Sequence, residues 1–302
     1  MTEPRRPLPL GTEDGLPFSK GVMARTLMAT GVPAMRAYEL AVRLETDLRE
    51  RGGQTIDLDR LQELAAEVLG AEEGERTARR LRRIERLREL DLPVVILVGG
   101  GTGTGKSTVA TEVAHRLGIT RVTSTDFIRQ TMRAFFSKEF MPSVHYSSFE
   151  AGEALPAAER EAGDPLLVGY LDQTRHVLVG VKASIDRALE EGWSMVLEGV
   201  HLVPGLIPEE TIENALVVQC VLAIDDEDAH ASHFMIRDAA SGGTRPVDKY
   251  MDRLEDIRRI QRLIVSRARR NGVPVIENTN MERAISSVME LVLSGADRLQ
   301  HV

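Results

Sequence analysis

Residues 100–107, with the sequence GGTGTGKS, constrain the fold of this chain more than any other feature. They fit the pattern G-x-x-x-x-G-K-[ST], in which a glycine-rich loop surrounds a phosphate group. An apolar, β-branched run at 94–98 precedes the loop and is typical of a strand buried on both faces of a parallel sheet. Residues 107–117 read as a helix that ends at Gly118. The segment therefore predicts a strand, a loop and a helix.

This arrangement points backbone N–H groups and the positive end of a helix at a single anion. A polyphosphate is the expected ligand, with Lys106 reaching its β- and γ-phosphates and the Ser107 hydroxyl binding Mg²⁺. A glycine-rich turn without a ligand is the alternative, but it would not need a lysine followed by a hydroxyl. The predicted nucleotide-binding residues of the loop are Gly101, Thr102, Gly103, Thr104, Gly105, Lys106, Ser107 and Thr108.

The composition narrows the class of protein. A length of 302 residues favours one larger and one smaller domain. The only cysteine, Cys220, excludes a disulfide framework and a cysteine-based zinc site, which indicates a reducing cytoplasm. No segment resembles a signal peptide or a membrane span, so a soluble intracellular protein is expected. The net charge of −8 argues against broad nucleic-acid binding, so an anionic substrate needs local positive charge.

The order of patterns along the chain predicts a fold class. Residues 1–16, rich in proline and glycine, read as a flexible tail, and 17–90 read as a small all-helical domain that ends in an arginine-rich helix at 75–90. That helix is read as a solvated connector with one docked apolar stripe, or alternatively as an anion-binding surface. Further strands are expected at 121–123, 195–197, 216–224 and 273–276, with helices between them. Residues 91–302 therefore predict a doubly wound parallel α/β sheet of the P-loop NTPase type.

Asp126 follows the second predicted strand, where the ligand crevice of an α/β sheet lies. A carboxylate at this place can accept the proton of an acceptor hydroxyl, or can hold Mg²⁺ through water. The alternative is an N-cap for the helix that begins near Phe127. Arg129 and Arg133 lie four residues apart on that helix, a spacing that suits an anionic acceptor, although each alone is more often solvated.

Glu198 ends the third predicted strand and is the candidate acid for ordering Mg²⁺, with a purely structural acid as the alternative. His201, three residues later, could hold an anionic acceptor or be a hydrogen-bonded loop histidine. The glycine-containing loop at 239–246 predicts a lid in which Arg237 and Arg245 contact the transferred phosphoryl group. Asn278 follows the last predicted strand, where a base contact or an ordinary polar turn is expected.

Five motifs occur in an order and spacing that resemble the 2-phosphoglycerate kinases: GGGTGTGKST, RVTSTDFIRQTMR, SKEFMPSVHYSSF, VLEGVHLVPG and IENTN. The resemblance covers residues 93–302. It implies transfer of the γ-phosphate of ATP, with Mg²⁺, to the 3-hydroxyl of 2-phosphoglycerate, giving 2,3-bisphosphoglycerate. It adds Lys138, His145 and His201 to the candidates for binding this small trianion, although a surface lysine and satisfied histidines explain them as well.

The segment that begins at 17 resembles the ATP-cone domain that precedes the kinase in this family. The segment 230–234, HASHF, departs from the family pattern because more basic residues are expected there. Because of this departure, the sequence predicts the type of reaction more closely than the identity of the acceptor. The alternatives are a kinase of another polyol phosphate or of an RNA-attached hydroxyl, and a nucleotide-sensing protein without catalysis. A homo-oligomer is compatible with the sequence, and no membrane partner is expected.

Overall fold

The computed structural model describes residues 18–52, 56–207, 214–240 and 247–299. These residues divide into two compact units. The first contains the described parts of 1–91 with 116–118 and 289–299, and the second contains 92–115 and the described parts of 119–288. The predicted tail at 1–16 lies outside the described residues. The predicted domain boundary between 90 and 91 stays a prediction, and the placement of 289–299 in the first unit is a feature that the sequence patterns did not indicate.

Four helices make the first part of the first unit: α1 (Lys20–Ala29), α2 (Ala34–Arg51), α3 (Leu58–Leu69) and α4 (Ala71–Glu89). Gly52 ends α2 in the left-handed conformation, and the Asp57 carboxylate caps the N-terminus of α3. Gly74 lets α4 approach α3 closely, because a Cβ atom there would lie 2.5 Å from the Ala66 nitrogen. Apolar side chains of these helices form one buried core, which includes Met23, Leu27, Leu40, Leu44, Leu61, Leu64 and Leu81.

The arginine-rich helix α4 buries its apolar stripe, as the connector interpretation predicts: Leu81, Ile84 and Leu87 are all buried. Arg83 is held by acids of the C-terminal helix α12 (Met281–Leu299). Its Nη1 donates to Glu290 Oε1 at 2.7 Å, and its Nε donates to Asp297 Oδ2 at 2.8 Å. These bonds commit the guanidinium of Arg83 to internal partners in the first unit.

The second unit contains a five-stranded sheet in the order β2-β3-β1-β4-β5, and every neighbouring pair is parallel. Each strand lies within two residues of its predicted bounds, and the predicted doubly wound α/β class is confirmed. The register pairs Val98 of β1 with Glu198 of β3, and Ser124 of β2 with the same Glu198. The carboxyl ends of these three strands therefore meet at one edge. The strands are β1 (Val94–Gly100), β2 (Val122–Ser124), β3 (Met195–Gly199), β4 (Leu216–Ala223) and β5 (Val275–Glu277).

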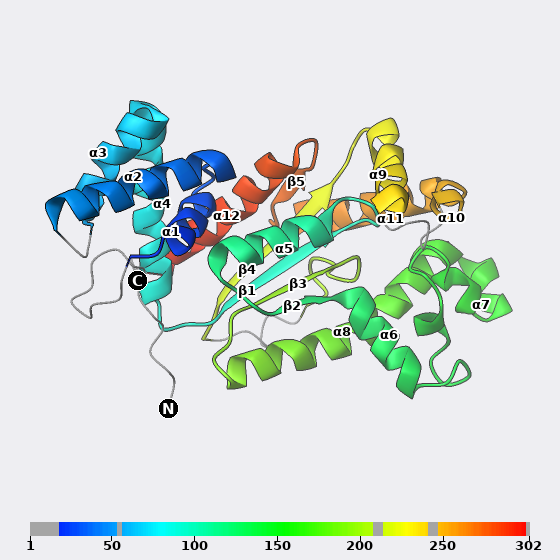
Figure 1. Cartoon of the computed structure of the whole chain (residues 1–302). Helices are drawn as coiled ribbons and strands as arrows, with labels where there is room; N and C mark the ends of the chain where they lie inside the picture. Colours follow the sequence, from blue (N-terminus) through cyan, green and yellow to red (C-terminus); the bar gives the residue numbers. More distant parts are fainter. Residues whose placement is uncertain (1–17, 53–55, 208–213, 241–246, 300–302) are drawn as a thin grey trace. The chain divides into compact units, whose positions relative to one another are not determined.

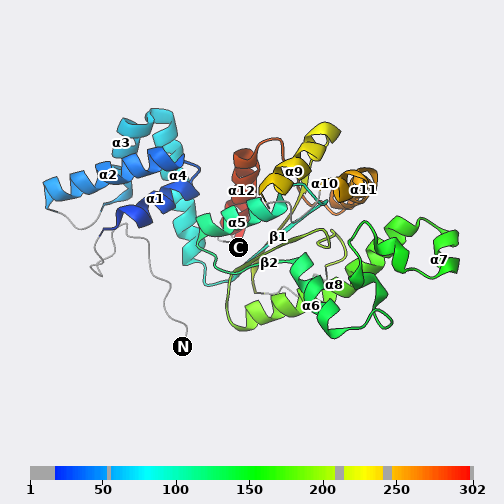
Figure 2. The same ribbon diagram turned by 45° about the vertical axis from the view of Figure 1, so that its right-hand side comes forward.

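Helices cover both faces of this sheet. Figures 1 and 2 show α5 (Lys106–Leu117) and α8 (Pro165–Glu190) on opposite sides of the strands. Val177 and Val181 of α8 pack in one cluster with Leu97 of β1, whereas α11 (Leu254–Arg270) packs against β4. No helix within the described ranges is long and apolar enough to cross a membrane. The remaining helical elements are α6 (Thr125–Phe135), η1 (Pro142–His145), η2 (Ala151–Ala154), α7 (Ala157–Ala162), α9 (Glu227–Ala240) and α10 (Val247–Met251).

Candidate active site

The phosphate-binding loop, residues 100–107, connects the fully buried strand β1 to α5. Gly103 and Gly105 have φ values of 85° and 82°, which residues with a side chain rarely adopt. The Lys106 ammonium is almost fully buried, and its Nζ donates a hydrogen bond of 2.6 Å to the Gly101 carbonyl. Burial lowers the pKa of Lys106, and the carboxylates of Glu198 and Asp126 oppose that shift. The loop thus places one desolvated cation among its backbone amides.

Helix α9 supports the loop from outside with two histidines. His230 Nε2 donates to the Thr102 carbonyl at 2.7 Å, and His233 Nδ1 donates to the Gly103 carbonyl at 3.1 Å. The Phe234 ring lies under Gly103, where a Cβ atom would be 2.4 Å from the ring. The segment that is less basic than expected therefore holds the loop carbonyls. Sequence analysis missed this role, although the three-residue spacing of the histidines was visible.

Asn278 also supports the loop. Its side-chain amide is buried and donates to the Thr104 carbonyl at 2.9 Å. The amide nitrogen would lie only 2.5 Å from a Cβ atom at Gly105, so the contact depends on that glycine. The predicted base contact of Asn278 stays a prediction, and the observed contact is with the loop backbone.

Ser107 and Glu198 form the corner of the site where a metal ion was predicted. The Ser107 hydroxyl donates to Glu198 Oε1 at 2.9 Å, and both side chains line the same cavity. No cluster of three or more acidic, histidine or cysteine side chains that suits a metal occurs among the described residues. Mg²⁺ needs few protein ligands when phosphates and water complete its octahedron. One hydroxyl and one carboxylate fit that requirement.

Asp126 lies in the first turn of α6, but it is not the N-cap of that helix. The Ser124 hydroxyl is the cap and accepts the Phe127 N–H. The interpretation of Asp126 as an N-cap is therefore wrong, because the helix begins two residues earlier than the sequence suggested. Arg129 Nε donates to Asp126 Oδ1 at 3.2 Å, which orients a carboxylate that is otherwise largely exposed to the cavity.

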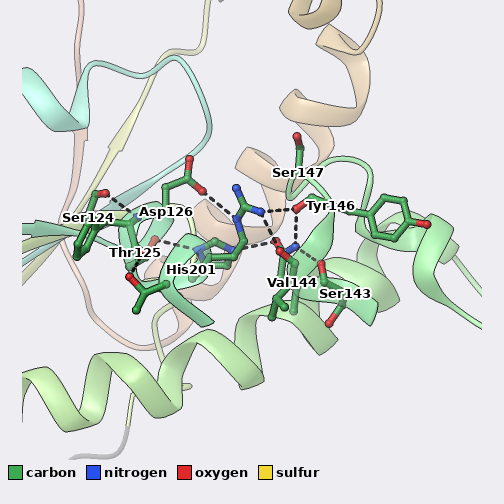
Figure 3. Close-up of polar contacts among 12 residues, drawn as sticks. Ser124, Thr125, Asp126, Ser143, Val144, Tyr146, Ser147 and His201 are labelled. Carbon is green, nitrogen blue, oxygen red and sulfur yellow. Dashed lines mark hydrogen bonds and ion pairs between the residues drawn. The ribbon is translucent and has the colours of Figure 1, made fainter. Parts of the chain in front are cut away.

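Arg129 is buried and makes two further bonds to the segment after α6. Its Nη1 donates to the carbonyl of Val144 at 3.0 Å and to that of Tyr146 at 2.9 Å (Figure 3). The guanidinium therefore ties Asp126 to the segment 144–146. Its positive charge stays within the lining of the cavity.

The other predicted acceptor residues lie elsewhere. Arg133 is exposed on α6, and Lys138 lies over the Tyr146 ring with its Nζ 4.6 Å from the ring centre. His145 donates through Nε2 to the Phe136 carbonyl at 2.9 Å. The part of the cavity lining that the structure describes does not include these three side chains. Their predicted contact with the acceptor stays a prediction.

His201 is completely buried between two polar side chains. Gln173 donates through its amide nitrogen to the carbonyls of Ser143 and Tyr146, so its oxygen faces His201 and accepts the Nε2 proton at 2.9 Å. His201 Nδ1 then accepts the Thr125 hydroxyl at 2.8 Å, as Figure 3 shows. Burial lowers the pKa of His201 to about 3, with Asp126 opposing the shift. His201 is a neutral histidine that positions the start of α6.

This pKa predicts a pH dependence of stability. Because folding lowers the pKa from 6.5 to about 3, the unfolded chain binds more protons in that window, and stability falls as the pH drops below 6.5. Wild-type protein should lose about 2 kcal/mol more unfolding free energy between pH 7.0 and pH 5.0 than His201→Gln, which keeps a donor toward Gln173 but does not titrate. Urea unfolding at pH of about 7.0, 6.0 and 5.0 measures this difference.

His115 is exposed on α5 and gives the matched control, because His115→Gln should keep the wild-type slope. Equal slopes for wild type and His201→Gln would mean that His201 is not held neutral.

A cavity of about 500 Å³ brings the predicted groups together. Predicted residues in its lining are Thr102, Gly103, Gly105, Lys106, Ser107, Thr108, Asp126, Arg129 and Glu198. Gly101 and Thr104 belong to the loop but are not part of this lining. The Arg237 side chain and Arg245 lie outside the described residues, so their predicted roles in a lid stay predictions. The lining also contains Ser147, Ser148, Phe149, His233 and Tyr250, which sequence analysis did not assign to the site.

Curated proteins with extensive similarity share one name. The 2-phosphoglycerate kinase of Methanothermobacter thermautotrophicus is 40% identical over 274 residues, which cover 91% of this chain and 89% of that protein. The 2-phosphoglycerate kinase of Methanopyrus kandleri is 36% identical and covers 92% and 84%. The chain belongs to the 2-phosphoglycerate kinase family. A further member of the family, from Thermococcus kodakarensis, is 36% identical and covers 91% and 92%.

Other comparisons add little to this assignment. No protein-family model matches the chain. Solved structures with lower similarity include a gluconokinase from Sinorhizobium meliloti, with 17% identity and a TM-score of 0.37. A shikimate kinase from Acinetobacter baumannii gives 17% identity and a TM-score of 0.38. The alignments cover 70% and 67% of this chain, and 95% and 94% of those proteins. The similarity to the 2-phosphoglycerate kinase family therefore rests on the sequence over nine tenths of the chain.

Proposed function

We propose that this protein transfers the γ-phosphate of ATP to the 3-hydroxyl of 2-phosphoglycerate, giving 2,3-bisphosphoglycerate. The observation that supports the proposal is a cavity whose lining contains residues of the phosphate-binding loop together with Asp126 and Arg129. Membership of the 2-phosphoglycerate kinase family supports the same acceptor. No observation favours the alternatives, a kinase of another polyol phosphate or RNA hydroxyl, or a nucleotide sensor without catalysis.

In this proposal the loop binds the nucleotide phosphates. Backbone N–H groups from Gly101 to Ser107 surround the β-phosphate, and the N-terminus of α5 adds its positive dipole. Lys106 bridges toward the γ-phosphate, where negative charge shifts onto the leaving oxygen as the bond breaks. Because Lys106 is already desolvated, its charge acts in a site with few competing waters. His230, His233 and Asn278 keep the loop in this shape through its carbonyls.

Asp126 acts on the acceptor. Arg129 Nε binds one oxygen of the Asp126 carboxylate. The other carboxylate oxygen can accept the proton of the 3-hydroxyl while the hydroxyl oxygen attacks the γ-phosphate. In this step the O3–P bond forms, the bond from the γ-phosphorus to the β,γ-bridging oxygen breaks, and ADP leaves. The proton passes to the Asp126 carboxylate. Arg129 also contributes positive charge for a trianionic acceptor in a protein whose net charge is negative.

Mg²⁺ is part of the proposal because Ser107 and Glu198 offer the oxygen ligands that this ion takes in kinases. When bound, it neutralises charge on the β- and γ-phosphates. Ser107 would hold it directly, and Glu198 would orient a water on it. We also propose that Arg237 and Arg245 approach the transferred group from α9 and the following loop.

The proposed acceptor predicts a selective assay result. ADP release, measured by a coupled assay with ATP and Mg²⁺, should depend on 2-phosphoglycerate and exceed the rate with glycerate or 3-phosphoglycerate by at least about 100-fold. Glycerate lacks the 2-phosphate, and in 3-phosphoglycerate the 3-hydroxyl is already esterified. Release that does not depend on any acceptor would indicate an ATPase. A clear preference for another phosphorylated acid or polyol would reassign the acceptor.

A further inference from the structure

The turn Ser147–Phe149 forms part of the wall of the cavity that the phosphate-binding loop also lines. The Glu150 N–H donates to the Ser147 carbonyl at 2.9 Å and closes this turn directly before η2. Ser147, Ser148 and Phe149 all line the same cavity as Lys106. None of the three was identified as functional from the sequence, and the proposed transfer step does not use them.

Ser148 has donors that no part of the protein uses. Its side chain lines the cavity although the residue is only 7% exposed. Within the described part of the chain, neither its hydroxyl nor its backbone N–H has a hydrogen-bond partner. Because the residue is largely buried and its hydroxyl reaches the open cavity without a protein partner, the hydroxyl is available to a ligand there. The ligand must accept hydrogen bonds.

The segment before the turn is held in place by the side chains of Gln173 and Arg129. The carbonyls of Ser143 and Tyr146 accept the Gln173 amide, and those of Val144 and Tyr146 accept Arg129 Nη1. Figure 3 shows Ser143, Val144 and Tyr146 with the hydrogen bonds that their carbonyls accept. These bonds fix the segment that leads into the turn, and Ser147 donates to the Glu150 carboxylate, so the hydroxyl and N–H of Ser148 are the donors that remain for a ligand.

Positive charge accompanies these donors. Arg129 is buried in the cavity wall, and its Nη2 makes none of the bonds that occupy Nε and Nη1. Lys249 of α10 also lies beside the turn, with its Nζ 3.3 Å from Ser147 Oγ, but its charge is paired with Glu150 Oε2 at 2.9 Å, so Arg129 is the cation that remains for a ligand. A hydroxyl, a backbone N–H and a guanidinium together suit a dianionic phosphate.

We propose that the turn Ser147–Phe149, with Arg129, binds the phosphate that the acceptor already carries. The inference rests on the proposed function, and it adds the part of the site that selects a phosphorylated acceptor. It places the existing phosphate of the acceptor against the turn and the reacting hydroxyl against Asp126. The protein would thereby discriminate against an acceptor without a phosphate, because binding such a molecule would leave Ser148 and Arg129 unpaired.

Two substitutions at Ser148 test the subsite by steady-state kinetics. Ser148→Ala should raise KM for 2-phosphoglycerate about 10- to 100-fold, because a hydrogen bond to a charged group is lost, and should leave KM for ATP within about twofold. Ser148→Asp should lower kcat/KM for 2-phosphoglycerate at least as much through repulsion of the phosphate. Inorganic phosphate should inhibit the wild type competitively against 2-phosphoglycerate, with a Ki that rises in parallel in Ser148→Ala.

Ser137→Ala is the matched control, because Ser137 lies between α6 and η1 and is exposed outside the cavity. It should keep the wild-type KM and Ki values. If wild type turns over 2-phosphoglycerate but Ser148→Ala and Ser148→Asp leave KM and the phosphate Ki unchanged, the subsite is wrong and the proposed function stands.

If wild type turns over no phosphorylated acid, the proposed function fails and the subsite is judged by binding. Inorganic phosphate in the presence of ATP should then raise the melting temperature of wild type and of Ser137→Ala, but not that of Ser148→Asp. Equal shifts for all three proteins would overturn the subsite. Melting curves without phosphate identify any variant that has failed to fold.

Discussion

Lys106→Met is expected to lower kcat/KM for ATP by roughly 10²- to 10³-fold or more, because the variant loses the fixed cation that stabilises charge on the β- and γ-phosphates. Methionine keeps an unbranched stem of similar length in the buried site. The effect should appear in kcat as well as in ATP binding, since charge on the leaving oxygen grows in the transition state. Steady-state kinetics with 2-phosphoglycerate as acceptor measures both.

The folded state should tolerate this substitution. Burial lowers the pKa of Lys106, which means that the charged form is held in the protein against a desolvation cost. Methionine removes that cost, so the melting temperature without nucleotide should equal or exceed that of the wild type. Lys182→Met is the control, because Lys182 pairs with Asp186 on the exposed surface of α8. Wild-type turnover by Lys106→Met would contradict the role of the phosphate-binding loop in transfer.

Asp126→Asn is expected to lower kcat by about 10²- to 10⁴-fold, the usual contribution of a general base. The amide oxygen of asparagine can still accept the hydrogen bond from Arg129 Nε, so the local geometry should persist. It cannot take the proton of the acceptor hydroxyl. KM for ATP should therefore change by less than about threefold, because the lost interaction develops only in the transition state.

Asp172→Asn provides the comparison, since Asp172 is a half-exposed acid on α8 that faces His176. Its kinetic constants should match those of the wild type. An equal loss of kcat and ATP affinity in Asp126→Asn would assign Asp126 to metal binding in place of proton transfer. An unchanged kcat would leave the reaction without its proposed base.

Local patterns predicted the fold well because the three central strands of the sheet, β3, β1 and β4, are strongly apolar. The β-branched run before the phosphate-binding loop has no stable alternative to a buried strand, and each parallel neighbour shows the same pattern. The loop itself follows from its glycines, three of which adopt positive φ values. Ser107 and Glu198 could be paired in advance, since both were expected at the carboxyl edge of the sheet.

The residues that hold the phosphate-binding loop and line the cavity could not be predicted from local sequence patterns in the same way. His230 and His233 contact the loop more than 120 residues away in sequence, and only tertiary packing shows which carbonyls they bind. Ser148 has an ordinary local sequence, and its proposed role depends on its position in the wall of the cavity that Lys106 also lines. Arg129 and Arg133 look equivalent on a helical wheel, yet only Arg129 is buried in the cavity wall. Contacts between distant segments therefore determine which of these residues reach the cavity and the phosphate-binding loop, and sequence spacing alone does not show them.

The central claim is that the γ-phosphate of ATP reaches the 3-hydroxyl of 2-phosphoglycerate in this cavity. Phosphorus NMR of a reaction with ATP, Mg²⁺ and 2-phosphoglycerate tests it most directly, with Lys106→Met as the inactive reference. We expect the signals of a product with two phosphate esters on adjacent carbons to grow in step with ADP. Growth of ADP with inorganic phosphate alone, or no change in the wild-type sample, would contradict the assignment.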